Sequence, residues 1–377
     1  MLRFPEQDSH RAIPARLSCS CALTGALRIG RPWSLPVRSA PTTEYGELKR
    51  LVKEQGLLEP QVAYYHLKTA IALGLLAVVV AFAAWTTNIF ALLGSAVLLG
   101  LVSTQIALLA HDVGHWQGFR GTRSNAVARF FFGNVLLGVS YSWWNIKHNQ
   151  HHATPNHIDN DPDIQFSMLV FSVDQIKDRP VWLRPVIAVQ AFVLLWLLPF
   201  QALNMRISSV QHLFAANADK RWLQVFGMAL HAVLYGALLF ATGSWWLALA
   251  FFAIHQATFG VYNSSVFASN HKGMPVIPVD GRMDFLREQV ITSRNVHGYW
   301  LTDFWYGGLN YQIEHHLFPN MPRNNLNRAQ AVVRTFCEER GISYHATGLF
   351  ESYREVLVHL HKTSASLRGA GKRAAAA

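Results

Sequence analysis

The stretch His148-Asn149-Gln150-His151-His152 decides how this chain must fold, because it concentrates three imidazoles within five residues. On a helix, the three histidines stand at positions i, i+3 and i+4, which share one face. Imidazoles gathered on one face are typical of a metal site rather than of an apolar core. Other segments must therefore bring the remaining ligands to this helix.

Two more segments repeat the pattern, giving three histidine boxes in chain order. His111 and His115 form an i, i+4 pair, and Gln312, His315 and His316 stand at i, i+3 and i+4. Seven of the 18 histidines lie in these boxes. A catalytic zinc uses about three protein ligands, so seven histidines predict two metal ions. No box reads His-Glu-x-x-His, so zinc-protease chemistry lacks its base.

The composition places the chain among membrane proteins. Of its 377 residues, 51% are hydrophobic and only 15% are charged, whereas soluble proteins average about 25% charged. The net charge of +11 also suits nucleic-acid binding. However, the basic residues flank apolar segments as the positive-inside rule expects, so we expect no nucleic-acid partner.

Two long uncharged runs predict the membrane spans. No charged residue occurs from Thr69 to His111 or from residue 222 to 271. Each run is long enough for two spans of about 20 residues. Short polar turns near residues 85–88 and 242–244 divide them, which predicts four spans: about 69–85, 89–110, 222–241 and 245–264.

Charge asymmetry predicts the orientation. Lys49, Arg50, Lys53 and Lys68 precede the first span, and the loop 206–221 is basic, so both should be cytoplasmic. The uncharged segment 185–205 must then lie in the membrane plane or be re-entrant. With that arrangement, all three boxes and both termini face the cytoplasm.

The expected fold is an all-α integral membrane protein with four spans, interfacial or re-entrant helices and a cytoplasmic helical cap carrying the di-metal site. We expect one domain over residues 44–363, between a disordered basic arm (1–43) and a disordered tail (364–377). A targeting segment or a mis-called start codon would give an arm of similar composition. Within the domain we expect an amphipathic helix, an aromatic interfacial helix and two cap helices, at residues 43–66, 129–144, 325–340 and 349–362.

The boxes H-x3-H, H-x2-HH and Q-x2-HH, with two spans before the first and two between the second and third, resemble the membrane fatty acid desaturases. The run Gly308–Pro319 (GLNYQIEHHLFP), the segment Trp144–Lys147 and the segment Asn270–Gly273 match as well. Gln312 in place of the first histidine of box three resembles the front-end branch and related bacterial acyl-CoA or acyl-lipid desaturases. The resemblance covers about residues 44–363.

The resemblance implies a centre of two iron ions (Fe2+/Fe3+) and no catalytic residues beyond its ligands. The implied ligands are His111, His115, His148, His151, His152, His271, His315 and His316. It makes Asn270 and Gln312 candidates for water-mediated contacts or for hydrogen bonds to a ligand. Asp112 and Glu314 are candidates to orient imidazole N–H groups, and Trp143 and Trp144 are candidates to line a substrate tunnel.

By the same resemblance, the reaction takes O2, two electrons and a –CH2–CH2– segment of an acyl-CoA or acyl-lipid, and returns a cis alkene and two waters. Many front-end desaturases carry a fused cytochrome b5 domain with a His-Pro-Gly-Gly motif, which this sequence lacks. A separate ferredoxin, flavin reductase or free cytochrome b5 is then expected to supply the electrons.

Two other functions remain open from the sequence. A lipid hydroxylase or alkane monooxygenase shares the three-box plan, although Gln312 and the Leu-Phe-Pro run after box three favour a desaturase. A histidine-rich metal transporter or sensor would also bind metal. Transport sites are expected near the middle of the membrane, whereas these boxes lie at or beyond the ends of spans.

Overall fold

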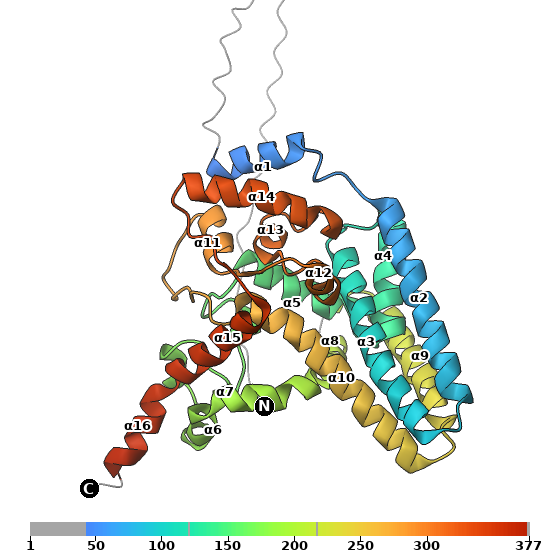
Figure 1. The fold of residues 1–377 in the computed structure, drawn as a ribbon. Helices are drawn as coiled ribbons and strands as arrows, with labels where there is room; N and C mark the ends of the chain where they lie inside the picture. The colour runs from blue at the N-terminus through green and yellow to red at the C-terminus, as the bar shows by residue number, and fades with distance from the viewer. Residues whose placement is uncertain (1–42, 120, 216–217, 375–377) are drawn as a thin grey trace, which may run out of the picture. The chain divides into compact units, whose positions relative to one another are not determined.

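The computed structural model describes residues 43–119, 121–215 and 218–374, and these residues are almost entirely helical (Figure 1). The two strands, β1 (Asn295–Val296) and β2 (Ala346–Thr347), form one short parallel pair with Asn295 opposite Ala346. The all-α prediction is therefore confirmed. The predicted basic arm lies almost entirely outside the described residues.

Four helical segments have the length and composition to cross a membrane: α2 (Val62–Trp85), α3 (Ile89–Gly114), the continuous run Gln190–Phe214 and α9 (Arg221–Phe240). Three of these coincide with predicted spans. The predicted span 245–264 lies in α10 (Trp245–His271), which is not among the four because polar residues such as His255 and Gln256 interrupt its apolar sequence.

The run Gln190–Phe214 consists of α7 (Gln190–Leu197), the 3-10 turn η5 (Leu198–Phe200) and α8 (Gln201–Phe214). Figure 1 shows α7 running across the direction of α2, α3 and α9. This orientation fits a segment in the membrane plane, although the length of the run also suits a span. The in-plane role of 185–205 thus stays a prediction.

The helices expose large apolar side chains on their outer faces. Val78 of α2 and Val233 of α9 are each 67% exposed, and Phe240 is 89% exposed. Water would penalise such surfaces by about 25 cal/mol for each Å² of apolar area, whereas lipid tails would not. The chain is therefore a membrane protein, with α3 as its most buried long helix.

Figure 1 shows how the long helices deliver the boxes to one region. The turns from α2 to α3 and from α9 to α10 lie at the same end of the helices. The opposite ends of α3 and α10 reach α5 (Tyr141–Ala153) and α13 (Gln312–Leu317), the helices of boxes two and three. The three boxes therefore meet at one end of the helical bundle.

The prediction of one helix over residues 129–144 was wrong. The structure has α4 (Thr122–Arg129), a π-helix η1 (Phe130–Leu137) and then a break before α5. Gly138 ends η1 in the left-handed region at φ 65°, and Ser140 caps α5 by accepting a hydrogen bond from the Trp143 N–H at 3.2 Å. A left-handed glycine followed by a serine cap stops one helix and starts another.

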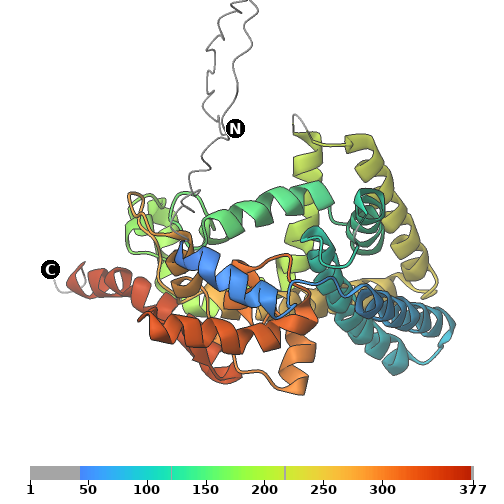
Figure 2. The same cartoon turned by 90° about the horizontal axis from the view of Figure 1, so that it is seen from above.

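The predicted helix over 43–66 is also divided. Helix α1 (Glu44–Glu54) ends before Pro60, and α2 begins at Val62. Gly56, at φ 67°, ends α1 in the left-handed region, and Pro60, which lacks the N–H that a helix interior needs, separates it from α2. Figures 1 and 2 show α1 lying along α14 (Arg323–Glu339), so this segment belongs to the cap.

The two predicted cap helices are confirmed as α14 and α15 (Leu349–Thr363). Residues Ala365–Ala374 form α16, so a helix stands where we expected a disordered tail. The remaining elements are short: η2 (Pro162–Ile164), η3 (Asp174–Ile176), η4 (Val181–Leu183), α6 (Arg184–Ala188), α11 (Phe285–Ile291) and α12 (Trp300–Tyr306).

A glycine on α10 tests how closely this helix packs on η5. A Cβ atom at Gly260 would lie 2.5 Å from the Pro199 carbonyl oxygen, whereas one at Gly236 of α9 would meet nothing within 4 Å. We expect Gly260→Ala to lower stability by about 1–3 kcal/mol through overpacking. Gly236→Ala should be neutral or stabilising, since alanine favours helix. Thermal unfolding of both variants in detergent would check this, and equal unfolding temperatures would contradict the packing.

Candidate metal centre

The structure gathers eight histidines into two groups, each compact enough for one metal ion. The first group contains His111, His115, His148, His152 and His315, and the second contains His151, His271 and His316. Within each group the candidate ligand atoms lie within 4.8 Å of one another. All eight histidines predicted as ligands are therefore brought together, in two sets.

The distances in the first group fit a single metal ion. The Nε2 atom of His148 lies 2.9 Å from His115 Nε2, 3.2 Å from His111 Nε2 and 3.1 Å from His152 Nε2. His315 Nε2 is 3.2 Å from His152 Nε2. Two nitrogens that each stand about 2.0–2.1 Å from one metal are about 2.9–3.4 Å apart at octahedral or tetrahedral angles.

The second group is completed from two other helices. His151 Nε2 lies 3.3 Å from His271 Nε2, at the end of α10. His316 of α13 stacks at 4.1 Å on His152 of the first group, and its ring centroid lies 4.5 Å from that of His271. The buried His316 Nε2 has no hydrogen-bond partner among the described residues. A cation between these three rings would satisfy it.

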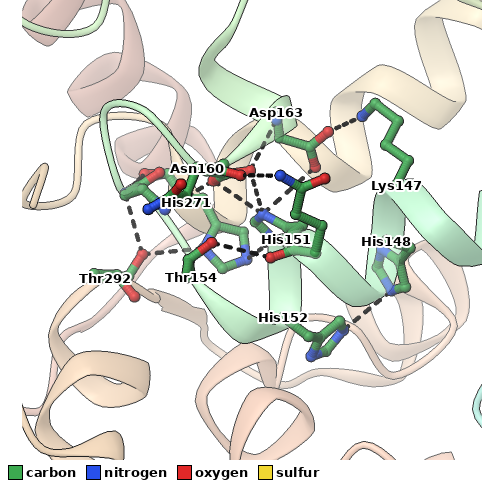
Figure 3. Close-up of polar contacts among 12 residues, drawn as sticks. Lys147, His148, His151, His152, Thr154, Asn160, Asp163, His271 and Thr292 are labelled. Atoms are coloured by element: carbon green, nitrogen blue, oxygen red, sulfur yellow. Dashed lines mark hydrogen bonds and ion pairs between the residues drawn. The ribbon is translucent and has the colours of Figure 1, made fainter. Parts of the chain in front are cut away.

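The box-two triplet is divided between the two groups, as Figure 3 shows. His148 and His152 point toward one another, while His151 points toward His271. Residues at i and i+4 are separated by about 40° around a helix, and the residue at i+3 lies about 60° to the other side of the first. One helix turn thus serves two adjacent metal positions.

The outer nitrogen of each second-group histidine faces a hydrogen-bond acceptor. His151 Nδ1 donates to Asp161 at 3.0 Å, and His271 Nδ1 donates to the Thr292 carbonyl at 3.0 Å. His316 Nδ1 donates to Gln289 Oε1 at 2.8 Å, and Gln289 is held by its own bond to the His152 carbonyl. Because Nδ1 carries the proton, each Nε2 presents a free electron pair toward the group.

Asp161 is the strongest of these acceptors. It is fully buried and also accepts the N–H groups of Asn156 at 2.7 Å and Asp163 at 2.8 Å. Burial alone would raise the pKa of its carboxyl, but His151 and Lys272 together with these contacts lower the pKa to about 2. The carboxylate therefore stays charged at neutral pH and holds the His151 ring in place.

The candidate Asp112 lies where we expected an orienting carboxylate. His111 Nδ1 is 3.1 Å from Asp112 Oδ1, and Arg323 forms a buried ion pair with the other carboxylate oxygen. Arg323 also donates to the Leu108 carbonyl. The pair joins the end of α3 to α14, so the first box is fixed to the cap.

Burial keeps four further histidines of boxes two and three neutral. It lowers the pKa of His148, His152, His315 and His316 well below the usual value, and neighbouring imidazoles lower it further. Neutral imidazole is the form that binds metals. The donor set thus consists of nitrogen ligands ready to coordinate at neutral pH.

Gln312 and Asn270 form a hydrogen-bonded pair beside the second group. Asn270 donates from Nδ2 to Gln312 Oε1 at 2.9 Å, and Gln312 Nε2 lies 2.9 Å from His271 Nε2. An amide N–H has no electron pair to give a metal. In this arrangement Gln312 is placed to donate a hydrogen bond into the second group rather than to coordinate.

Glu314 does not contact any box imidazole as a hydrogen-bond acceptor. Its buried carboxylate accepts from Asn295 Nδ2 at 2.7 Å and from the Tyr344 hydroxyl at 2.8 Å, and burial raises its pKa to about 7. Asn295 Oδ1 in turn accepts the Ile313 N–H. Glu314 therefore anchors α13 to β1 and to the segment before β2, and it does not orient a ligand directly.

The two candidate tunnel tryptophans pack against helices and imidazoles. Trp144 stacks on the His148 ring at 4.4 Å, and Trp143 packs against the core around α3. A separate apolar cavity of about 750 Å³ lies between α7, α10, α12 and α15, and neither tryptophan lines it. Ala268 and Tyr306 belong to its wall, close to the His271 end of α10.

Arg294 holds that end of α10 in place and was not apparent from the sequence. Its fully buried guanidinium donates to the Ser269 carbonyl at 2.7 Å and the Lys272 carbonyl at 3.0 Å, and pairs with Glu355 of α15 at 2.6 Å. Carbonyls at a helix C-terminus lack helical partners and favour a cation. The His271 position therefore depends on α15, which also walls the cavity.

Only one of the other supporting residues had a signal in the sequence. Asp161 stands in an acidic loop just after box two, and that proximity was a usable signal. Gln289, Thr292 and Arg323 have no sequence pattern that relates them to the boxes, because their contacts span at least 21 residues of chain.

Comparisons with known proteins identify the family of this chain. The profile of the family described as Fatty acid desaturase matches residues 87–348. A Delta(6)-fatty-acid desaturase of Caenorhabditis elegans is 31% identical over 82% of this chain and 72% of its own length. An acyl-lipid (9-3)-desaturase of Physcomitrium patens is 30% identical, covering 87% of this chain and 64% of its own length. A Delta(8)-fatty-acid desaturase of Arabidopsis thaliana is 29% identical over 83% and 73%.

The chain belongs to the fatty acid desaturase family, and is therefore an oxidoreductase of lipid metabolism. It spans roughly two thirds to three quarters of the length of these three relatives. The predicted family is thus confirmed, and the histidine groups are compatible with a metal site.

Asp161→Asn tests whether the outer acceptor controls metal binding. An amide can present its N–H₂ to His151 and favours the wrong imidazole tautomer, so we expect metal affinity to fall about 10–100-fold. Elemental analysis of the purified protein would measure this, with the exposed Asp159→Asn as the matched control. Wild-type metal content in Asp161→Asn would contradict the assigned role.

Proposed function

We propose that this protein introduces a cis double bond into a fatty acyl chain, using O2 at a histidine-ligated di-iron centre. The observation that carries the proposal is the division of eight imidazoles, seven of them buried, into two adjacent groups with metal-ligand spacing. Iron supplies the redox chemistry that lets such a centre activate O2 against C–H bonds. The family relationship supports a desaturase over a hydroxylase of the same three-box plan.

The donor set suits iron. Imidazole is a ligand for iron, copper, nickel and zinc, and the five-plus-three arrangement leaves the second group short of protein ligands. Gln312 faces this less crowded side. Each second-group imidazole is held from outside by Asp161, Thr292 or Gln289, so that its inward nitrogen is fixed before iron binds.

We infer that the apolar cavity holds the acyl chain. Its lining is almost entirely apolar, and its volume of about 750 Å³ lies in the range of small-molecule sites. It reaches Ala268, three residues before His271, and Tyr306, whose hydroxyl bonds Ser269 Oγ at 2.8 Å. The chain would thus lie next to the α10 end that presents His271.

The distribution of basic residues favours a cytoplasmic active site. The basic residues before α2 and in the loop before α9 mark this end of the helices as the cytoplasmic one. An acyl-CoA or an acyl-lipid could reach it there, as could a separate electron donor. A transport role fits poorly, since both groups lie at helix ends within the cap.

The activity is tested by expression in a host that lacks its own desaturase. Supplied with a compatible electron donor, the chain should form new cis double bonds, located by mass spectrometry, and the purified protein should contain about two iron atoms. His151→Ala should abolish the product because it removes a ligand of the second group. His361→Ala, at an exposed position outside the centre, should retain it. Hydroxy acids without alkenes would instead indicate a hydroxylase.

Ala268→Phe tests the cavity as the acyl site. The added ring would fill part of the cavity beside α12, so we expect the longest acyl chain converted to become shorter by several carbons. Product profiles from a mixture of chain lengths would show the shift. Phe350, which lines the same cavity, offers the reverse change: Phe350→Ala should extend the range. An unchanged profile in both variants would place the acyl chain elsewhere.

A further inference from the structure

The large apolar cavity has an entrance at the protein surface and an inner end beside α10. Phe350, Tyr299 and Leu195 line the entrance and are 85%, 61% and 50% exposed. Tyr306 and Val356 line the inner end, where each is at most 2% exposed. A flexible chain that enters between the exposed side chains is therefore led from the surface into the interior of the protein.

The walls of this entrance are apolar and aromatic. Helix α7, which forms one wall, exposes Phe192 and Trp196 and belongs to a run that is long and apolar enough to cross a membrane. Helix α12, which forms another wall, exposes Trp300 and Phe304. Apolar side chains are stable against lipid tails, and tryptophan favours the boundary between lipid and water. The walls of the entrance therefore continue into a surface that suits lipid.

The helices that wall the cavity offer no free cation to a phosphate group. Helices α7, α10 and α12 contain no Lys or Arg. In α15, Arg354 donates from Nε to the Glu351 carboxylate at 2.7 Å, and Lys362 stands about 18 Å from Phe350 along the helix, at about 1.5 Å per residue. The phosphate groups of coenzyme A would thus find no unpaired Lys or Arg on these described walls.

Helix N-termini, which are the other common partners of phosphate in proteins, carry acidic residues here. Helix α12 begins at Trp300 and has Asp303 in its first turn, and α15 begins at Leu349 and has Glu351 in its first turn. A carboxylate in the first turn neutralises the positive end of a helix and repels a phosphate. The entrance therefore disfavours the polyanionic head of an acyl-CoA and accepts a headgroup without net charge.

We infer that the acyl chain enters this cavity sideways from the bilayer, as part of a glycerolipid whose headgroup carries no net charge. This entry route rests on the proposed function and specifies the form of its substrate. The headgroup remains at the membrane surface, and the chain passes between Phe350 and Tyr299 toward Tyr306. The ester bond of the lipid stays intact. The –CH2–CH2– segment gives up two hydrogen atoms, which with O2, two protons and two electrons from the reductant form two waters.

Photo-crosslinking of the iron-free chain tests the entrance apart from catalysis. The chain is placed in nanodiscs of phosphatidylcholine, with matched amounts of either a phosphatidylcholine or an acyl-CoA that carries a diazirine near the end of the same acyl chain. After irradiation, tandem mass spectrometry locates the adducts. We expect the phosphatidylcholine probe to label the inner lining around Tyr306 and Val356 about tenfold more strongly than the acyl-CoA probe, because like-charge contacts penalise the acyl-CoA.

A charge added at the entrance should change this preference. Phe350→Lys supplies the missing cation, so we expect it to raise labelling by the acyl-CoA probe about two- to fivefold, as one exposed ion pair allows, and salt should reduce the gain. Val279→Lys adds the same charge at an exposed turn between α10 and α11 that does not line the cavity. It should leave labelling by both probes unchanged.

Inner labelling of the wild-type chain by the acyl-CoA probe that equals labelling by phosphatidylcholine would overturn the entry route. So would phosphatidylcholine adducts confined to the outer faces of α2 and α9, because the lipid would then only surround the protein. Equal effects of Phe350→Lys and Val279→Lys would contradict the entrance. If Phe350→Lys fails to fold, the two probes on the wild-type chain still decide the matter.

The proposed function is tested separately on the iron-loaded chain, which is reduced with dithionite without oxygen and then given O2. New double bonds in the phosphatidylcholine of the nanodisc, with the ester intact, support the entry route. Double bonds formed only on added acyl-CoA overturn it but leave the desaturase standing. No alkene on either substrate, across a mixture of acyl chains, refutes the desaturase.

Discussion

The structure depends on the convergence of eight imidazoles, seven of them buried and His152 half-buried, whose ring nitrogens gather in two compact groups. Two unprotonated ring nitrogens cannot satisfy one another, and each unsatisfied buried polar atom costs about 1–3 kcal/mol. A metal ion bound in each group would remove this cost and make the convergence favourable. The acceptors on the outer nitrogens, among them Asp161 and Gln289, are as necessary as the imidazoles, because they decide which nitrogen carries the proton.

This requirement explains why the cap and the long helices form one unit. Helix α3 carries box one out of the apolar bundle, and α10 carries His271. The cap then fixes both ends through buried ion pairs, Arg323 with Asp112 and Arg294 with Glu355. A buried arginine costs stability when it has no partner, so each pair ties the correct folding of the cap to the correct position of a ligand.

The apolar sequence was the easiest part to predict, because lipid excludes charge. The uncharged runs located α2, α3 and α9 to within several residues. Breaks within helices were harder to predict. A single helix across residues 129–144 was a reasonable expectation from its aromatic and apolar content, yet Gly138 and Ser140 divide it. The run Gln190–Phe214 is long and apolar enough to cross a membrane, and composition does not encode whether such a segment lies across the membrane or in its plane.

The sequence by itself determined the imidazoles of the three boxes and their spacing, and it predicted two metal positions, since these depend on which side chains recur at i, i+3 and i+4. Only the tertiary structure decided how the ligands are shared. In the box-two triplet, His148 and His152 face the first group and His151 faces the second. The helix fixes the angles between these side chains, but the partners that each one meets come from α3, α10 and α13. Their positions depend on packing between segments that lie between 33 and 163 residues apart in the chain.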